Sequence, residues 1–312
     1  MISVIMLTYN RERYVARAIE AVLRQTYRDF EFIIIDNGSL DRSGEIAEEY
    51  AKKDSRILTE HIKAGSIGRG RNAGVSKARG EYVAFVDDDD VAACDMLEFL
   101  YGLITENQAE IAICGAQKNV NGKILPHSIW EESCVWDAEE AVAELLKRKR
   151  NNAGMPTKLI KKELLDREPF KENCHYEDIW VCYKYMAMAD KTAAYGLPKY
   201  CFTRHTGNNS SFTQDASRWR PEQIEEYLAA FRERTEYISA KLPGLTDMVR
   251  YSEWSYMISM CDKIKTYRLT GCGTVFSQMA DALRKNRQEF MDSSYIQEFE
   301  KNWMAEYGFL EG

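Results

Sequence analysis

Short apolar runs alternate with segments of helical periodicity along residues 1–115. The runs are nearly continuous, as in residues 30–35 (FEFIII), which is typical of strands that are covered on both faces. Residues 11–25, in contrast, place their apolar side chains at helical spacing. This alternation predicts an α/β fold with a mainly parallel sheet flanked by helices. The predicted strands are residues 3–8, 30–35, 56–60, 82–86 and 110–114, and the predicted helices are residues 11–25, 44–53, 68–78 and 95–104.

The pattern changes after residue 214, where long helical segments replace the alternation. Pro243-Gly244 and Gly271-Cys272-Gly273 separate these segments. We therefore expect one α/β domain over residues 1–214 and an all-helical subdomain over residues 215–312. The subdomain is expected to pack against the sheet domain or against a second copy of the chain, with membrane-surface contact as the alternative. The predicted helices are residues 222–241, 247–269, 274–290 and 295–307.

Charge and cysteine usage narrow the class of protein. The net charge of −7 argues against a nucleic-acid binder, which would show a basic face. The N-terminal residues MISVIMLTYNRERY are typical of a strand and not of a signal peptide, and no window is apolar enough to span a membrane. Eight scattered cysteines without a CxxC pair favour a reducing, cytoplasmic setting. The basic run at residues 147–150 (KRKR) predicts the solvated end of a helix.

Polar residues follow three of the predicted strands. They are Thr8-Tyr9-Asn10, Asp36-Asn37-Gly38-Ser39 and the aspartate run at residues 87–90, which ends the stretch FVDDDD. The carboxyl ends of parallel strands meet at one edge of a sheet, where ligands bind in such folds. We therefore expect the three strand ends to converge on one site.

Four adjacent carboxylates need something to offset their repulsion. Two unit charges about 4 Å apart repel by ~1 kcal/mol in water and by ~4 kcal/mol at an effective dielectric constant near 20. Alternate carboxylates at a strand end can direct oxygen atoms at one Mg²⁺ or Mn²⁺ ion, which commonly shares such ligands with substrate phosphates. The alternative is an acidic cap on the following helix, for which one aspartate would suffice. The run therefore favours a divalent-cation site.

Two other segments admit two interpretations each. Asp36 can accept hydrogen bonds from a nucleobase or a ribose, or it can form a turn before the next helix. Residues 65–74 (GSIGRGRNAG) do not match the GxGxxG dinucleotide fingerprint. Within them Arg71 offers a fixed positive fork to a pyrophosphate or a base, or it is a solvated loop residue.

Four segments taken together, in this order and at these spacings, resemble the family 2 glycosyltransferases of the GT-A (Rossmann-like) fold. The segments are TYNR, QTYRDFEFIIIDNGSLD, GRGRNAGVSKARGEYVAFVDDDD and HYEDIW. The resemblance is strong over residues 1–105 and thins out over the C-terminal helices. It implies an inverting, nucleotide-sugar-dependent hexosyltransferase in which residues 1–115 bind the donor and residues 116–214 bind the acceptor. A UDP-sugar is the expected donor, with dTDP- and GDP-sugars as alternatives.

The resemblance also assigns roles to individual residues on the donor side. The Asp-x-Asp motif of the family falls on Asp87 and Asp89, of which Asp89 would bind the Mn²⁺ or Mg²⁺ ion that bridges the diphosphate. Asn37 departs from the family pattern, which often has an aspartate there, and Cys94 stands where a proline is common. The implied donor-binding residues are Thr8, Tyr9, Asp36, Arg71, Asp87, Asp88, Arg204 and His205, and the implied metal ligands are Asp87 and Asp89.

The catalytic residues implied by the resemblance lie in HYEDIW, residues 175–180. Asp178 would be the general base and Glu177 its acidic neighbour. Asp178 would deprotonate an acceptor hydroxyl that attacks the anomeric carbon, which inverts its configuration. Without the resemblance, the pair would suit an acidic helix N-terminus equally well. Residues 207–212 (GNNSSF), after Arg204 and His205, are an expected lid over the donor, with a solvated loop as the alternative.

The acceptor and two rival functions stay open. A growing cell-surface polysaccharide, a lipid-linked oligosaccharide or a glycosylated protein would each suit the resemblance, and a lipid-linked acceptor would imply peripheral contact at the inner face of the plasma membrane. A homo-oligomer formed through the C-terminal helices is also considered. A nucleotidyltransferase would be expected to carry a glycine-rich, lysine-bearing loop after the first strand, which TYNRERY lacks. A non-catalytic nucleotide-sugar-binding protein would tolerate the loss of Asp178.

Overall fold

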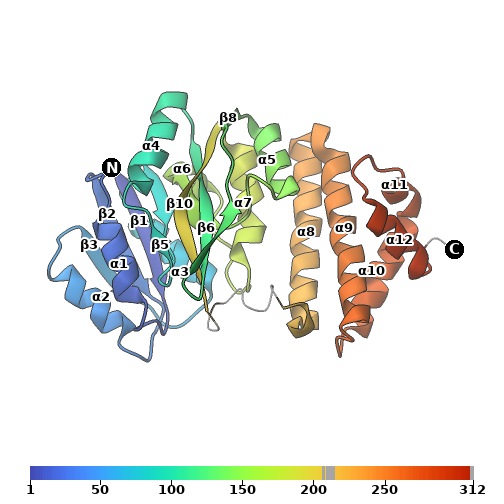
Figure 1. The fold of residues 1–312 in the computed structure, drawn as a ribbon, viewed down its shortest axis with the longest axis horizontal. Helices are drawn as coiled ribbons and strands as arrows, with labels where there is room; N and C mark the ends of the chain where they lie inside the picture. The colour runs from blue at the N-terminus through green and yellow to red at the C-terminus, as the bar shows by residue number, and fades with distance from the viewer. Residues whose placement is uncertain (206–207, 209–214, 310–312) are drawn as a thin grey trace. The chain divides into compact units, whose positions relative to one another are not determined.

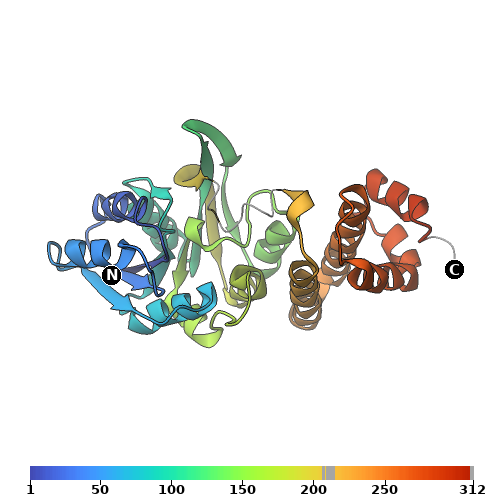
Figure 2. The same ribbon diagram turned by 90° about the horizontal axis from the view of Figure 1, so that it is seen from below.

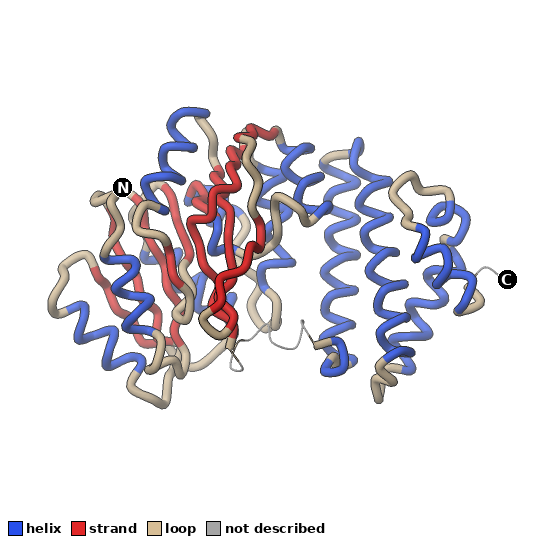
Figure 3. Tube along the Cα trace, viewed as in Figure 1, coloured by secondary structure: helices blue, strands red, loops and turns tan. Residues whose placement is uncertain are grey.

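The computed structural model describes residues 1–205, 208 and 215–309. The chain divides into two compact units, Met1–His205 and Thr206–Gly312 (Figure 1). The first unit combines a sheet with helices, and the described part of the second unit is entirely helical (Figure 3). Among the described residues, no helix is both long and apolar enough to cross a membrane.

One mixed sheet of ten strands forms the centre of the first unit. Its strand order is β3-β2-β1-β4-β9-β6-β10-β5, with β7 beside β6 and β8 beside β10. The first four strands are parallel as predicted, and the antiparallel pairings all involve later strands. The strands are β1 (Ile2–Thr8), β2 (Phe30–Asp36), β3 (Ile57–His61), β4 (Tyr82–Phe85), β5 (Val91–Ala92), β6 (Ile111–Val120), β7 (Lys123–Ser128), β8 (Ser133–Trp136), β9 (Lys158–Lys161) and β10 (Thr192–Arg204).

Helices cover both faces of the sheet. Figure 2 shows α1 and α3 on opposite sides of the parallel strands. The residues of β2 are all buried, in agreement with the continuous apolar run FEFIII. The helices of this unit are α1 (Val15–Leu23), α2 (Ser43–Ala51), α3 (Ile67–Lys77), α4 (Met96–Asn107), α5 (Ala138–Lys147), α6 (Lys162–Arg167) and α7 (Glu177–Met188), with a 3₁₀ turn at Met155–Thr157.

The segment after β1 is a loop where a helix was predicted. The helix expected from residue 11 begins only at Val15. Asn10 has a left-handed φ of 54°, and its backbone N–H donates to Ser39 Oγ at 3.1 Å. The N–H of Arg11 donates to Ser43 Oγ at 2.7 Å. These bonds anchor residues 10 and 11 to the loop after β2 and to the start of α2, and with the left-handed Asn10 they hold this segment in a non-helical conformation.

Residues 116–205 contain elements that the apolar pattern did not predict, namely β7, β8, α5, β9, α6, α7 and β10. The hairpin strand β7 (KILPHS) is mostly exposed and contains Pro126. Exposed edge strands show neither a continuous nor an alternating apolar pattern, so they give little signal in the sequence.

The second unit contains five α-helices among its described residues. Their core includes Trp254, Met260, Leu283 and Phe290, all largely or fully buried. The helix predicted over residues 274–290 is interrupted at Asn286, whose side chain donates to Ala282 O at 2.8 Å and ends the first part. The helices are α8 (Pro221–Lys241), α9 (Thr246–Thr266), α10 (Gly273–Lys285), α11 (Arg287–Met291) and α12 (Glu298–Glu306), with 3₁₀ turns at Ala216–Arg218 and Pro243–Leu245.

The cysteines form no disulfide within the described residues. All eight lie within the described residues and carry free thiols. Cys114, Cys182 and Cys261 are buried among apolar side chains, where a thiol packs as a small hydrophobe.

Candidate active site

The structure brings the three polar strand ends together. Thr8 at the end of β1 is paired with Asp36 at the end of β2, and the N–H of Asn37 donates to Thr8 O at 2.9 Å. The N–H of Tyr9 donates to Asp88 Oδ2 at 3.3 Å, which joins the end of β1 to the turn after β4. The convergence follows from the parallel register of β2, β1 and β4.

The aspartate run is a turn in which two of the four side chains hold the turn itself. Asp88 accepts the Tyr9 N–H and lies 3.8 Å from Arg11 Nε. Asp90 is buried and accepts the Thr203 N–H at 2.6 Å, which ties the turn to the end of β10. The Tyr200 hydroxyl accepts the N–H of Asp87 at 3.0 Å. Asp88 and Asp90 therefore shape the turn, whereas the side chains of Asp87 and Asp89 contact basic residues, namely Arg71 for Asp87 and Arg11 and His205 for Asp89.

Basic side chains from three segments surround Asp89. Its Oδ2 lies 2.9 Å from His205 Nε2 and 3.7 Å from Arg11 Nε. The His205 ring is stacked on Tyr14 at 4.5 Å between centroids, and Arg17 donates to the backbone oxygen of Asp89 at 2.6 Å. The sequence prediction included His205 and missed Arg11, Tyr14 and Arg17. The signal that could have indicated Arg11 and Tyr14 is the charged stretch RERY shortly after the first strand, and Arg17 follows it by three residues.

Arg71 lies between the two groups of acids that the sequence singled out. Its guanidinium is 2.6 Å from Glu177 Oε1 and 3.8 Å from Asp87 Oδ1. The rings of Phe85 and Phe170 lie 5.3 and 5.4 Å from it. Burial opposes its charge, but the carboxylates of Glu177 and Asp87 raise the pKa of Arg71 above its ordinary value. Arg71 is therefore a buried structural cation that also faces the donor side.

Glycines set the position of Arg71. At Gly70 and Gly74 of α3, an added Cβ would come within 2.5 Å of the Leu7 and Ile5 side chains of β1. A Cβ at either position would force the helix away from the strand. The glycine-rich segment thus allows close helix–strand packing, which places Arg71 beside the aspartate turn.

Glu177 and Asp178 form the first turn of α7. This is the acidic helix N-terminus that the residues alone suggested. Glu177, however, is only 4% exposed, and burial raises its pKa to about 7 against the opposing effect of Arg71. Asp178 Oδ1 accepts the N–H of Ile179 at 2.8 Å, and its charge raises the pKa values of Asp87 and Glu177. The pair is therefore electrostatically coupled to the aspartate turn.

The expected repulsion within the aspartate run is present. Burial, followed by the charge of Asp89, raises the pKa of Asp88 to about 7. Burial also raises the pKa of Asp87 to about 6, with Arg71 opposing this shift and Asp89 adding to it. The pKa of Asp90 is raised for the same reason, by burial and by its aspartate neighbours. Added positive charge at this turn would be stabilising.

Asp36 is held by a histidine that the sequence did not single out. Its Oδ1 accepts the Ser39 N–H at 3.0 Å, and its Oδ2 lies 2.8 Å from His61 Nδ1. The other ring nitrogen of His61 is 2.8 Å from Glu48 Oε1 on α2. The hydrogen bond to Asp36 raises the pKa of His61 against the effect of burial. Asp36 thus forms both the turn that one interpretation predicted and a contact with an adjacent histidine.

The remaining predicted donor residues lie nearby or at the edge of the described chain. The Tyr9 side chain is 47% exposed and Thr8 is buried. Arg204 lies over the Phe202 ring at 5.3 Å, and its charge lowers the pKa of Asp87. The expected lid at residues 207–212 lies outside the described residues, apart from Asn208.

The carboxylate oxygens of Asp87 and Asp89 suit a divalent cation that is shared with a substrate. Among residues 1–205, 208 and 215–309, no three His, Cys, Asp or Glu side chains are arranged to hold a metal ion by themselves. Mg²⁺ and Mn²⁺ sites commonly use one or two carboxylates and complete their shell with phosphate oxygens and water. Asp87 and Asp89 provide such oxygens, and the raised pKa of Asp87 marks the repulsion that a cation would relieve. These residues therefore fit a cation that binds together with a diphosphate.

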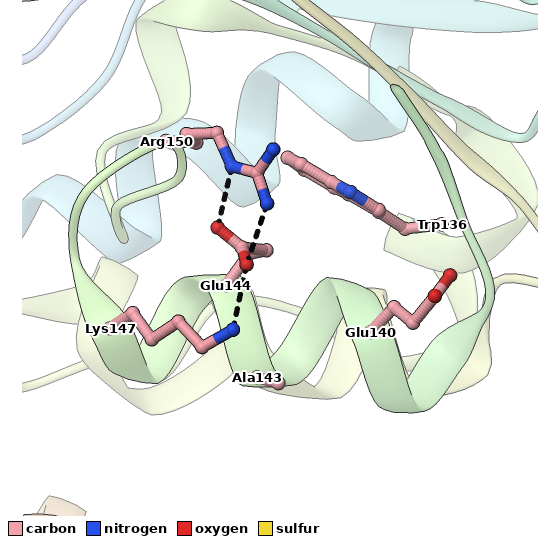
Figure 4. Close-up of a pocket in the computed structure, with 6 residues that line it drawn as sticks. All are labelled: Trp136, Glu140, Ala143, Glu144, Lys147 and Arg150. Carbon is pink, nitrogen blue, oxygen red and sulfur yellow. Dashed lines mark hydrogen bonds and ion pairs between the residues drawn. The ribbon is translucent and has the colours of Figure 1, made fainter.

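A separate cavity lies away from these residues, between β8 and α5 (Figure 4). Its volume is about 260 Å³, and Glu144 on its wall is 2.9 Å from both Lys147 Nζ and Arg150 Nη2. These pairs hold the pKa of Glu144 at about 2. The run KRKR thus ends α5 as predicted, with Arg150 folded back onto the helix. The residues that line the cavity are Trp136, Glu140, Ala143, Glu144, Lys147 and Arg150.

Comparison with known proteins identifies the family. Residues 3–173, more than half of the chain, match the family model described as Glycosyl transferase family 2. The chain is 31% identical over 239 residues to the glycosyltransferase GlyG of Streptococcus pneumoniae, which covers 73% of this chain and 78% of GlyG. It is 32% identical over 136 residues to the poly(ribitol-phosphate) beta-glucosyltransferase of Bacillus spizizenii, which covers 42% of this chain and 21% of that protein.

A solved structure confirms the fold. S. aureus TarS 1–349 in complex with UDP-GlcNAc matches with a TM-score of 0.73 at 22% sequence identity, over 93% of this chain and 81% of that one. The mixed sheet with flanking helices is therefore the GT-A arrangement that the resemblance implied. The chain belongs to glycosyl transferase family 2, and it is a glycosyltransferase with the GT-A fold.

Proposed function

We propose that this chain transfers a sugar from a UDP-sugar to a hydroxyl group of a cell-surface polymer, with inversion at the anomeric carbon. The observation that supports this most directly is the position of Arg71. One buried guanidinium contacts Glu177 at 2.6 Å and approaches Asp87 at 3.8 Å. The acids assigned to the donor and the acids assigned to the acceptor hydroxyl therefore interact with the same positive charge.

The donor would bind at the joined ends of β1, β2 and β4. Tyr9 and Asp36 would contact the base, and Asp87 and Asp89 would hold Mn²⁺ or Mg²⁺ together with the diphosphate. A bound divalent ion would supply positive charge to the departing nucleoside diphosphate. The complex of TarS with UDP-GlcNAc supports a UDP-sugar as the donor class.

Asp178 would act as the general base. Its carboxylate takes the proton of the acceptor hydroxyl, while the bond from that oxygen to the anomeric carbon forms and the bond to the diphosphate oxygen breaks. Because attack and departure occur on opposite faces in one step, the configuration inverts. Glu177, held by Arg71, fixes the first turn of α7 and so the position of Asp178.

The acceptor class rests on the relatives. The B. spizizenii relative is named for glucosyl transfer to poly(ribitol-phosphate), a polymer with free hydroxyl groups. A polymer or glycan of the cell envelope is therefore the proposed acceptor, and an enzyme that extends such a polymer would work in the cytoplasm, at or near the inner face of the membrane.

Calorimetric titration of the nucleotide followed by an assay of transfer tests the proposal. UDP, GDP, dTDP and CDP are titrated with and without Mn²⁺ into wild type, Asp89→Asn and the control Asp166→Asn, whose side chain pairs only with Lys162 in the described structure. We expect Mn²⁺-dependent binding of UDP that Asp89→Asn abolishes and Asp166→Asn retains. With a UDP-sugar that turns over, proton NMR of the product should show the inverted anomer.

Three results would contradict the proposal. Release of pyrophosphate from a nucleoside triphosphate and a sugar phosphate would indicate a nucleotidyltransferase. A retained anomeric configuration would remove the single-step mechanism. Tight UDP binding that ignores both Mn²⁺ and Asp89→Asn would remove the metal assignment.

A further inference from the structure

A strip of alternating side chains runs along the end of β10, beside the aspartate turn. Tyr200, Phe202 and Arg204 are two residues apart and therefore lie on one face of the strand. The Tyr200 hydroxyl accepts the N–H of Asp87 at 3.0 Å, so this face adjoins the acidic site. On the neighbouring parallel strand β6, Lys118 is paired in register with Phe202. Lys118 thus lies beside this strip, on the same face of the sheet.

Two other basic side chains meet at the ring of Phe202. The Arg204 guanidinium is 5.3 Å from the ring centroid, and the His127 ring from β7 lies 5.4 Å away in an edge-on arrangement. Tyr200 packs on the same ring at 5.0 Å. The hairpin of β6 and β7 and the end of β10 therefore bring Lys118, His127 and Arg204 around one aromatic side chain.

The charges in this cluster repel one another. Burial and the charge of Arg204 lower the pKa of Lys118. Burial, Lys118 and Arg204 lower the pKa of His127 to about 4, so this ring is neutral at physiological pH. In the part of the chain that the structure describes, no carboxylate forms an ion pair with the half-buried Lys118, whereas Arg71 and Arg150 each contact a buried glutamate. An anion at this place would offset the repulsion.

We propose that Lys118 and Arg204, with His127 beside them, form a subsite for a phosphate group of the acceptor. The inference rests on the proposed function, and it narrows the acceptor to a polymer or glycan that carries phosphate. Phosphate oxygens could also come from the diphosphate of the donor. The acceptor is favoured because Asp87 and Asp89, with a bound cation, would hold the diphosphate, whereas Lys118 lies on β6, the strand that pairs with the exposed hairpin strand β7.

The test combines a charge-removing variant with two ligands. Lys118→Gln is compared with Lys118→Arg, which keeps the charge, and with Lys123→Gln, which removes an exposed lysine at the start of β7. The ligands are a phosphodiester-linked glycerol phosphate oligomer, titrated with UDP and Mn²⁺ already bound, and UDP with Mn²⁺ alone. We expect Lys118→Gln to weaken oligomer binding by about tenfold or more, the range for losing a charged hydrogen bond, and to leave UDP binding unchanged. Lys118→Arg and Lys123→Gln should behave as wild type.

An NMR titration of the wild-type protein tests the cluster without any variant. The ring protons of His127 report its pKa, which should rise when inorganic phosphate at millimolar concentration neutralises the neighbouring charges. Lys118→Gln should also raise the pKa of His127, because it removes one of the charges that depress it.

Each alternative outcome has a distinct meaning. Equal loss of UDP affinity and oligomer affinity in Lys118→Gln would place the donor diphosphate at this subsite and overturn the acceptor assignment. Unchanged oligomer binding in Lys118→Gln, together with a His127 pKa that ignores phosphate, would show that the cluster binds no anion. Failure of UDP to bind the wild-type protein would overturn the proposed function, whereas the response of His127 to phosphate would be unaffected.

Discussion

The two compact units of the chain differ in how many polar and charged side chains they bury. In the described residues, the buried polar and charged side chains all belong to the first unit except Glu300. Glu300 caps α12 and accepts hydrogen bonds from Gln297 N at 2.8 Å and Tyr251 Oη at 3.1 Å. The core of the second unit is otherwise apolar and aromatic, with Trp254, Met260 and Leu283 among its members.

The first unit, in contrast, buries charges beside one another at the ends of its strands. Asp88, Asp89 and Asp90 are each less than 9% exposed, and Arg71 and Glu177 are similarly buried. Burial of carboxylates beside like charges opposes folding, which the raised pKa values of Asp88 and Glu177 record. The second unit is therefore stabilised by apolar packing, whereas the first gives up stability to hold these charges together, which is common at functional sites.

The largest expected effect is a loss of transfer activity without a loss of stability in the first unit. Asp178→Asn removes the proposed base and keeps the hydrogen bond that the side chain accepts from Ile179 N. We expect the transfer rate to fall by about 10²–10⁴-fold, the usual contribution of a general base. UDP should still bind and thermal stability should not fall, because the variant removes a charge that repels Asp87 and Glu177. Steady-state kinetics with calorimetry and a thermal melt checks this. Turnover near the wild-type rate would show that Asp178 is not the base.

The next largest effect should be a loss of stability without a change in UDP affinity. Leu283→Ala in α10 removes a fully buried side chain from the core of the second unit. We expect the free energy of unfolding to fall by about 2–5 kcal/mol, as for other buried leucines. The UDP affinity of the folded protein should stay the same, because no proposed site residue is altered. Urea unfolding and calorimetry measure both quantities, and a change in UDP affinity would mean that this core supports the donor site.

A third, smaller effect should depend on pH. The pKa of Asp88 is raised to about 7, so the folded state holds this proton more tightly than the unfolded state does. The contribution of Asp88 to stability is therefore favourable at low pH and is lost as the pH rises through about 7. Asp88→Asn removes this loss and keeps an oxygen that can accept the Tyr9 N–H.

Urea unfolding of both proteins without nucleotide measures the pH effect. Relative to wild type, Asp88→Asn should gain on the order of 1–3 kcal/mol between about pH 5 and pH 8. The difference between the two curves isolates Asp88 from other titrating groups, such as His61 and His127. A constant difference across this pH range would show that Asp88 is ionised throughout.

The smallest effect concerns the orientation of Asp36. His61→Gln removes the ring that links Asp36 to Glu48, with contacts of 2.8 Å on both sides. We expect the KM for the donor to rise by about 3–10-fold with kcat unchanged, because the variant loosens Asp36, which under the proposed function would bind the base equally in the ground and transition states. Glu48→Gln should give a smaller change in the same direction. A fall in kcat at constant KM would contradict this role.

Much of the donor half could be predicted from the sequence, because its signals are local. The run FEFIII predicts β2, whose neighbours in the chain, β1 and β3, are also its neighbours in the sheet. The strand ends at Thr8, Asp36 and Asp87 followed from that topology. The strand predicted at residues 110–114 is the buried first part of β6, but its extension to Val120 and the exposed strand β7 were not predicted, because exposed strands leave no apolar pattern, and Lys118 and His127 were missed with them.

Sequence alone determined which residues stand at the strand ends, since side-chain periodicity and a parallel βα alternation already fix that edge of the sheet. It also determined the family, through four segments whose order and spacing are specific. Only the tertiary structure decided which charges meet. Arg71 pairs with Glu177 across more than a hundred residues, and Asp89 meets His205 across a similar span. Such pairings depend on how strands and helices distant in the chain pack together, which no local pattern encodes.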